Sequence, residues 1–506
     1  MGRKTRKNLS TDQLEKVRLA LLDHLSRLLP NNSERREFVE KMSSPIPITL
    51  RINPLSAQAD RLRQVCNFNG SGVPWSQDVF LLDGNKDRIG PTFEHLLGGF
   101  YIQAKAATLA VSVLDPRPGE QVLDLAAAPG GKSTQIAGTM ENKGVLLANE
   151  PNSRRMSSLI GNLERCGVYN CVVTQTSGAR LARYFHNHFD RVLLDAPCSG
   201  DGILRKNQHV LSYWSTADAV YKSQQQIGLA RAAFHMLRPG GTMVYSTCSL
   251  STEENEDVLL ALSNTYQSCI EIIPVDQSVV GPPLPASVAA NYPDSFRGAA
   301  RVWPHHHDTE GAFVARIRKT EPTKWKAVDI ANENCTKHIP TNTSSTTEPL
   351  DYLRRIEKHW NVEVLLPDDI TVTASPKNLD VRPQRWKNYA KLAFYIRCGL
   401  KIASIHKGHP YLTHQAAVLW GANIGMRRLP ICWSDVQALF AGEKITPENV
   451  ANLRGEVLLT YGPWPITTGL VHSTGHVSGF LPKSLRMSGI CRLCDWENCA
   501  KNYQSP

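Results

Sequence analysis

Residues 121–134 of the chain read QVLDLAAAPGGKST, an apolar run followed by small residues and a glycine pair. The apolar run predicts a buried strand over residues 121–125, and the glycines predict a tight turn into a helix. Small side chains let a ligand approach the backbone, and the free amides at a helix start favour a negatively charged group. The stretch therefore predicts a ligand-binding loop at the carboxyl end of a strand.

The flanking sequence repeats the pattern of a strand followed by a helix. Further strands are predicted over residues 144–148, 171–174, 191–194 and 242–245, with helices over residues 154–166 and 223–237. Such alternation is typical of a parallel sheet that helices cover on both faces. Arg238-Pro239-Gly240-Gly241 predicts a sharp stop between the second helix and the last strand. The predicted fold class is α/β with a Rossmann-like core.

Composition divides the rest of the 506 residues into several expected domains. Residues 1–100 predict an α/β extension, with a helix from Thr11 and a strand over residues 48–52, and residues 101–320 hold the core domain. Residues 321–349 are rich in threonine, serine, asparagine and proline, and they predict a linker. A second α/β module is predicted over residues 350–454. Residues 455–506 predict short strands, such as 456–460, with glycine-rich turns.

The chain has a formal net charge of +11 and a pI near 9.0. Nucleic acid is the first candidate partner for this charge and an acidic membrane surface the second, although solubility alone explains it equally well. No apolar run reaches the ~20 residues of a membrane-spanning helix, and the N-terminal segment is not typical of a secretory signal. We therefore expect a soluble cytoplasmic protein whose twelve scattered cysteines are mostly free thiols.

Three interpretations of the glycine loop are open at this point. The loop could bind the carboxylate of S-adenosylmethionine, or its glycines could be purely structural. It could also be a phosphate-binding P-loop, because Gly131-Lys132-Ser133 has the required ending and Asp195 could bind magnesium, although Ala126 replaces the leading glycine. Glu150 favours the first interpretation, since nucleotide folds place an acid for ribose hydroxyls at the end of the second strand. A solvated carboxylate is the plainer explanation of Glu150.

Two cysteines follow later strands of the predicted sheet. Cys198 lies in DAPCSGDG, residues 195–202, and Cys248 lies in YSTCS, residues 245–249. Because the carboxyl ends of parallel strands line one crevice, both thiols are expected to face the same cleft. An isolated cysteine is usually a small buried apolar residue, but two beside small polar residues favour a chemical role.

A thiol in such a cleft suits methyl transfer to carbon 5 of a cytosine. That carbon is a weak nucleophile until a thiolate adds to carbon 6, which is covalent catalysis. The thiolate needs a lowered pKa or a nearby base or cation. Asp195 is placed to act as the acid beside N3, and a base must later remove the carbon 5 proton so that the thiol can leave.

These segments resemble the motifs of the RNA (cytosine-5) methyltransferases of the NOL/NOP/Sun family, from about residue 48 to residue 318. The resemblance implies a class I methyltransferase fold, S-adenosylmethionine as the cofactor, Cys248 as the nucleophile and Cys198 as the residue that releases the product. It places the cofactor beside Ala126, Ala127, Ala128, Pro129, Gly130, Gly131, Lys132, Glu150, Ser177 and Asp195.

The order of the parts, together with residues 302–305 and 310–313, is most similar to family members that act on the small ribosomal subunit. The resemblance implies a cytidine in the decoding region of 16S rRNA as the target, with free RNA or the 30S subunit as the partner. It also implies an RNA-binding N-terminal extension and a PUA-like RNA-binding module near residues 455–485. We expect a monomer with no metal and no membrane partner.

Several positions depart from the family pattern. Ala126 stands where a cysteine is common, Ala104 where a glutamate is usual, and Ala312 where a phenylalanine is usual. Ser177 stands where an aspartate contacts the adenine, which predicts a lowered cofactor affinity. A P-loop ATPase and a non-catalytic RNA-binding assembly factor that keeps the fold are the two alternative hypotheses.

Three weaker signals remain. Cys491, Cys494 and Cys499 have one zinc-like spacing, but only His472 or His476 could supply the fourth ligand that a structural zinc needs, so we do not expect a zinc site. The run His305-His306-His307 is expected to be a turn between strands, because adjacent residues seldom converge on one ion. Tyr213 and Trp214 beside Arg205 and Lys206 suit a flipped base and its phosphates, although Trp214 could equally belong to the core.

Overall fold

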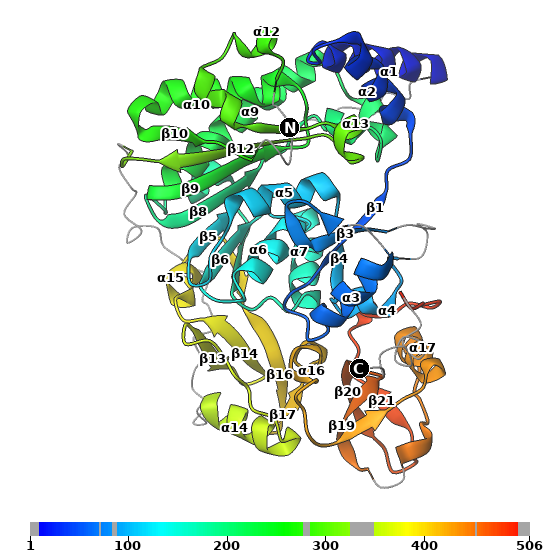
Figure 1. Ribbon diagram of the computed structural model, residues 1–506. Helices are drawn as coiled ribbons and strands as arrows, with labels where there is room; N and C mark the ends of the chain where they lie inside the picture. Colours follow the sequence, from blue (N-terminus) through cyan, green and yellow to red (C-terminus); the bar gives the residue numbers. More distant parts are fainter. Residues whose placement is uncertain are drawn as a thin grey trace, which may run out of the picture.

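The computed structural model describes residues 10–69, 72–82, 89–276, 284–323, 349–450 and 453–493. Residues 324–348 of the expected linker, and Cys494 and Cys499, lie outside this range. Nine strands of the described residues form the central sheet, in the order β10-β12-β9-β8-β5-β6-β7-β15, with β11 paired to β12 (Figure 1). Their bounds are β5 Gln121–Asp124, β6 Val145–Asn149, β7 Cys171–Thr174, β8 Phe189–Asp195, β9 Leu237–Thr247, β10 Ile270–Ile273, β11 Ala300–Val302, β12 Ala312–Lys319 and β15 Tyr395–Cys398.

Strands β5 to β9 are mutually parallel, and β5 pairs with both β6 and β8. The chain therefore reverses its direction of winding beside β5, which is where open α/β sheets bind ligands at the carboxyl ends of their strands. This confirms the predicted α/β class with a Rossmann-like core.

The predicted stop before the last strand was only partly right. Helix α9 (Thr216–Met236) ends beside the predicted residue 237, but β9 begins at once with Leu237. Gly240 has a φ of 75°, and the pairing of β8 with β9 shifts register between Phe189 and Arg191. A glycine in the left-handed region lets the chain absorb this irregularity within the strand.

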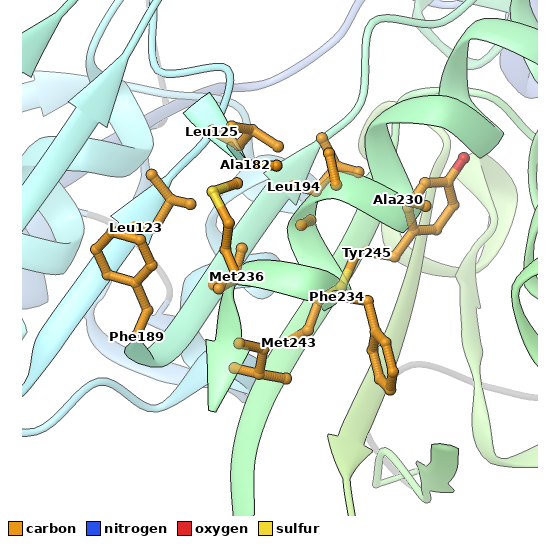
Figure 2. Packing of buried hydrophobic residues seen from close by; sticks show 14 of the residues in the cluster. Leu123, Leu125, Ala182, Phe189, Leu194, Ala230, Phe234, Met236, Met243 and Tyr245 are labelled. Carbon is orange, nitrogen blue, oxygen red and sulfur yellow. The ribbon is translucent and has the colours of Figure 1, made fainter. Parts of the chain in front are cut away.

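Both faces of the sheet are buried under helices. Leu123, Leu194 and Met243 pack on one face against α9, whose Phe234 and Met236 are fully buried (Figure 2). Val122 and Val244 point to the other face, where they pack in one cluster with residues of α5 and α6. Burial of these apolar side chains, at ~25 cal/mol per Å², is the main force that fixes the strand ends. The remaining helices of this region are α5 Lys105–Leu114, α6 Gly131–Thr139, α7 Ser153–Arg165, α8 Gly178–Leu181 and α10 Glu256–Tyr266.

Two helices precede the first strand, α1 (Thr11–Ser26) and α2 (Asn32–Ser43). Ser10 and Asn31 cap them by accepting hydrogen bonds from first-turn amides. Residues 195–202, which begin at the end of β8, form the Pro-Cys loop. The buried faces of α1 and α2 share a core with residues after this loop, after Cys248 and near β11. The members of this core include Leu21, Leu25, Phe38, Leu211, Trp214, Leu250 and Trp303. The helical pair therefore covers the side of the Rossmann-like domain that carries both cysteine loops.

The remaining strands form three four-stranded sheets, in the orders β2-β3-β1-β4, β13-β14-β16-β17 and β18-β19-β20-β21. The first and third share one apolar core, in which the Phe93 and Trp464 ring centroids lie 5.4 Å apart. The strands of the three sheets are β1 Ile48–Ile52, β2 Gly72–Val73, β3 Ser76–Leu82, β4 Phe100–Ile102, β13 Ile370–Ala374, β14 Asn378–Pro383, β16 Leu400–His406, β17 His409–Leu412, β18 Arg428–Pro430, β19 Gly455–Tyr461, β20 Trp464–Val471 and β21 Val477–Gly479.

The helices that lie between or before the strands of these parts of the chain are α3 Ala59–Asn69, α4 Phe93–Leu96, α14 Pro349–Trp360, α15 Trp386–Ala390, α16 His414–Trp420 and α17 Trp433–Ala441. One strand of the C-terminal half, β15, pairs antiparallel with β7 and so completes the central sheet. Among the described residues, no helix combines the length and the apolar character needed to cross a membrane.

Candidate active site

The two predicted cysteines meet beyond the ends of neighbouring strands. Cys198 follows β8 and Cys248 follows β9, and their sulfur atoms lie 2.8 Å apart. A hydrogen bond to Cys248 and burial together hold the pKa of Cys198 well above its usual value. Cys198 therefore keeps its proton and can donate it to a thiolate on Cys248. The two thiols are thus in contact, as expected for neighbouring strand ends, although of the two only Cys248 lines the adjacent cavity.

A cavity of about 450 Å³ opens beside Cys248. Lys132, Asp195 and Ser246 line its floor, and α5 contributes alanine side chains. Ala104 and Ala312, two of the positions that depart from the family pattern, also line it. The volume lies in the range that accommodates a small organic group such as a nucleobase.

Lys132 and Asp195 form an ion pair in this cavity, with 2.7 Å between Nζ and Oδ2. The other oxygen of Asp195 accepts a hydrogen bond of 3.0 Å from the Ser246 hydroxyl. Burial alone would lower the pKa of Lys132, but Asp195, and more weakly Asp124 and Cys248, raise it. A charged ammonium group thus lies within electrostatic reach of the Cys248 sulfur.

The glycine loop links β5 to α6. Gly130 has a φ of 107°, a conformation that strongly favours glycine, and α6 begins at the next residue. The amides of the first turn of α6 have no partner within the helix and face the carboxyl edge of the sheet. Beneath the loop, the buried side chain of Asp124 accepts a hydrogen bond of 2.7 Å from Ser133, and burial raises its pKa to about 6.

Glu150 and Ser177 occupy the same edge of the sheet. Glu150, at 2% exposure, accepts hydrogen bonds from the amides of Ala128 (3.3 Å) and Asn152 (2.8 Å). It therefore lies against the glycine loop rather than in solvent. Ser177 is exposed and caps α8, where its hydroxyl accepts from the amide of Arg180. Neither residue lines the cavity beside Cys248.

A buried carboxylate, Asp201, holds the two cysteine loops together. It accepts hydrogen bonds from the hydroxyls of Ser249 (2.9 Å) and Ser251 (2.5 Å) and from the amide of Leu250 (2.6 Å). Asp201 follows Cys198 in the chain, whereas its three donors follow Cys248. The carboxylate thus fixes one thiol relative to the other.

Glu254 makes a second connection between the same loops. It accepts from both the amide (2.9 Å) and the hydroxyl (2.5 Å) of Ser199, and from the Gln226 amide group (2.8 Å). Gln226, on α9, also donates to the carbonyl of Pro197 at 3.1 Å. The backbone on either side of Cys198 is therefore held from α9 and from the segment after Cys248.

Gly202 lies where three segments cross. Its amide donates to the Cys248 carbonyl at 3.0 Å, and its carbonyl accepts from the Gly311 amide at 2.8 Å. A Cβ atom at this position would lie 2.6 Å from the Cys248 oxygen and 2.8 Å from the Gly311 oxygen. Only glycine fits here without moving the backbone of Cys248.

Four residues of the site were not predicted from the sequence: Asp201, Gly202, Gln226 and Glu254. Asp201 and Gly202 lie in the quoted Pro-Cys segment, and their small polar surroundings were the available signal. Glu254 lies in an acidic run at a helix start, which is usually solvated. Nothing in the sequence marks Gln226, because its role depends on the packing of α9.

The basic and aromatic residues after the Pro-Cys loop separate into two groups. Arg205 has a fully buried side chain that donates to the carbonyls of Pro45 (2.6 Å) and Thr309 (3.0 Å) and pairs with Asp308 (2.8 Å), so it joins segments rather than facing RNA. Trp214 lies in the core beneath α1. By contrast, Tyr213 and Lys206 are 46% and 56% exposed, and Lys206 lines the cavity, where it pairs with Glu310 at 3.3 Å.

The histidine run adopts a one-turn helix, α13 (Pro304–His307), between β11 and β12. His305 and His306 contact Glu34 of α2, a neighbour that the sequence could not identify. One ring nitrogen of His472 bonds to Ser478 and one of His476 bonds to Thr446, and among the described residues neither histidine forms a metal-binding group with Cys491.

Comparisons with known proteins show which family this chain belongs to. The family model described as 16S rRNA methyltransferase RsmB/F matches residues 111–318, and that for the N-terminal domain of 16S rRNA methyltransferase RsmF matches residues 20–105. A relative from Vibrio parahaemolyticus named Ribosomal RNA small subunit methyltransferase F is 32% identical over 453 residues, which cover 87% of this chain and 92% of the relative. Its namesake from Erwinia tasmaniensis is 32% identical over 484 residues, which cover 93% and 97%.

Solved structures match the central part of the chain. A methyltransferase homolog from Pyrococcus horikoshii is 32% identical with a TM-score of 0.53, and the match covers 62% of this chain and all of that one. NSun6 from Pyrococcus horikoshii has a TM-score of 0.51 at 20% identity, covering 60% of this chain and 98% of its own, which is a likeness of fold.

Proposed function

Since this chain belongs to the RsmB/F family of 16S rRNA methyltransferases and uses S-adenosylmethionine to methylate rRNA, we propose that it acts on carbon 5 of a cytidine through a covalent bond between Cys248 and carbon 6. The observation that carries this proposal is the contact of 2.8 Å between Cys198 and Cys248 beside a cavity of nucleobase size. One sulfur can attack while the other handles a proton.

The residues at the carboxyl edge of the sheet fit the cofactor chemically. S-adenosylmethionine carries a carboxylate, an ammonium group and ribose hydroxyls, and it supplies the electrophilic methyl group. The amides at the start of α6 suit the carboxylate, while Glu150 and Asp195 can accept hydrogen bonds from the donor groups. We assign the cofactor to residues 126–132, Glu150, Ser177 and Asp195, with Ser177 lowering the affinity because its hydroxyl caps α8.

The attack step uses groups already adjacent in the cavity. The Cys248 thiolate adds to carbon 6, and negative charge moves through the ring toward N3, where a water held by Asp195 would supply a proton. Lys132 stays paired to Asp195 and keeps the local potential positive. Carbon 5 then takes the methyl group, and the bond from carbon 6 to sulfur persists until the carbon 5 proton is removed.

Release of the product is assigned to Cys198. In the free enzyme, the hydrogen bond to Cys248 is the largest cause of the raised pKa of Cys198. Once the Cys248 sulfur is bonded to carbon 6 it carries no negative charge, so this cause disappears and Cys198 can release its proton to water more easily. A Cys198 thiolate can then accept the carbon 5 proton, and the electrons left behind expel the Cys248 thiolate.

Two variants test this mechanism. Cys248→Ala is expected to abolish the transfer of tritiated methyl groups from S-adenosylmethionine to rRNA. Cys198→Ala is expected to accumulate a protein–RNA adduct that survives denaturing electrophoresis. Cys432→Ala, which removes an exposed thiol on another module, is the matched control and should behave like the wild type. Full activity in Cys248→Ala would exclude the covalent mechanism, and no adduct with Cys198→Ala would exclude the release role.

The target within 16S rRNA is the finer part of the proposal. We assign it to a cytidine of the decoding region, presented as free RNA or in the 30S subunit to a cytoplasmic monomer. The N-terminal extension and a PUA-like module over residues 455–506 would supply RNA contacts, since the target base must be turned out of its stack. Bisulfite mapping of 16S rRNA from a strain lacking the gene tests this, and unchanged methylation at every cytidine would contradict it.

The two alternative hypotheses lose their support. A P-loop would need Lys132 free to contact phosphates, whereas its Nζ is paired with Asp195. A non-catalytic factor has no use for two aligned thiols, and the family is one of methyltransferases.

A further inference from the structure

A cluster of metal-binding side chains lies outside the catalytic cavity, where α13 packs against α2. Glu34 Oε2 is 2.7 Å from His305 Nε2 and 2.8 Å from His306 Nε2. The three ligand atoms all lie within 4.8 Å of one another. The mechanism proposed above uses none of these residues.

Two adjacent histidines can converge here because the third group comes from another element. His305 and His306 follow one another on the single turn of α13, and Glu34 lies across from both on the first turn of α2. The His305 ring is fixed by Phe38, one helical turn after Glu34: their ring centroids lie 5.8 Å apart, and the His305 side chain is only 2% exposed. A ligand held in place by packing loses little entropy when it binds.

The other two ligands are open to solvent. The side chains of His306 and Glu34 are 34% and 27% exposed, so an ion has a path into the cluster and a water molecule can complete its coordination. Glu37 lies near His305 and adds negative charge.

We propose that Glu34, His305 and His306 bind one divalent transition-metal ion, with Zn²⁺ the best match to two nitrogens and a carboxylate. Three protein ligands and a water make a tetrahedral site. Bonds of about 2.0–2.1 Å place tetrahedral ligands roughly 3.3 Å apart. Glu34 Oε2 therefore needs to move away from each histidine nitrogen by only about 0.5 Å, and all three atoms already lie within 4.8 Å of one another. The ion joins α2 to the catalytic domain just before Asp308, the acid that pairs with Arg205.

The site is tested by metal binding to the full chain without a histidine tag. After treatment with a chelator and gel filtration, calorimetric titration with Zn²⁺ should give one tight site per chain. Loading with Co²⁺ should give the visible absorption bands of a tetrahedral ion. His306→Ala and Glu34→Gln should each weaken Zn²⁺ binding at least 10-fold, with circular dichroism confirming that the fold persists.

Two controls separate this site from other zinc ligands. His209→Ala removes an exposed histidine elsewhere and should leave binding unchanged. The triple variant Cys491→Ser, Cys494→Ser and Cys499→Ser should also bind one Zn²⁺ as the wild type does. The proposal is overturned if Zn²⁺ binding is absent, if it survives His306→Ala, or if only the cysteine variant loses it. These readouts do not involve methyl transfer, so they stand or fall independently of the proposed function.

Discussion

The substitution Gly202→Ala is expected to inactivate the enzyme without touching either thiol. The new methyl group would lie 2.6 Å from the Cys248 carbonyl oxygen and 2.8 Å from that of Gly311, both closer than real contacts of this kind. Both obstacles are backbone atoms, which cannot rotate away. The Pro-Cys loop and the Cys248 loop must therefore move apart.

The size of the effect follows from that displacement. A separation of about 0.5–1 Å stretches the hydrogen bonds from Gly202 to Cys248 and from Gly311 to Gly202, which are 3.0 Å and 2.8 Å long. Misplacement of reacting groups by ~1 Å costs about 100-fold in rate. We expect kcat to fall by about that factor, with a loss of roughly 1–3 kcal/mol in the free energy of unfolding from overpacking.

The assay is tritium transfer to rRNA under saturating substrate, combined with urea unfolding. Gly228→Ala is the matched control: this exposed glycine lies within α9 with no atom within 4 Å of the added Cβ. That variant should keep full activity and gain about 0.5–1 kcal/mol in stability, since alanine favours a helix. If Gly202→Ala retained activity within threefold of the wild type, the crossing at Gly202 would not set the position of Cys248.

Two further predictions concern other parts of the chain. Burial raises the pKa of Glu456 from its ordinary 4.5 to about 8, so the folded state binds this proton more tightly than the unfolded state does. The free energy of unfolding therefore falls as the pH rises between those two values, by up to about 1.4 kcal/mol per pH unit. Glu456→Gln should therefore be most stabilising, relative to the wild type, in thermal melts near pH 8, and an equal difference at pH 5 would contradict this. Lys206 is an exposed residue of the cavity, and Lys206→Ala should raise KM for rRNA with kcat little changed. The number of counterions released on RNA binding should fall by about one. An unaltered salt dependence, measured by filter binding, would contradict this.

The core of the fold was predictable because its signals are local. Strand periodicity placed β5 to β8 to within about two residues, although β9 begins earlier than predicted, and the rule that parallel strands share a carboxyl edge predicted that Cys198 and Cys248 lie close together. No comparable rule tells which helix packs beside a given loop. Gln226 and Glu254 belong to the site only because α9 packs against the segment after Cys248.

Arg205 and His305 show the same limit from the opposite direction. Both residues occur in sequence patterns that are typical of functional sites: Arg205 is a basic residue near aromatic residues, and His305 belongs to a run of histidines. Arg205 donates hydrogen bonds to two carbonyls and to Asp308, all of which lie about a hundred or more residues away in the chain. His305 meets an acid 271 residues earlier in the chain. Contacts at such separations are set by tertiary packing, which sequence patterns do not encode locally.

The pairing of β15 with β7 has a consequence for how this enzyme can be divided. Removing residues after the predicted linker would strip β7 of its neighbour and leave a row of bare backbone donors and acceptors, a surface that invites other chains to add to it. The Tyr389 hydroxyl, which donates to the Gln121 side chain at 3.1 Å, would be lost as well. The C-terminal half is therefore not an independent module. A chimera in which this half comes from a relative must also contain the edge strand β15, or its catalytic domain is expected to aggregate.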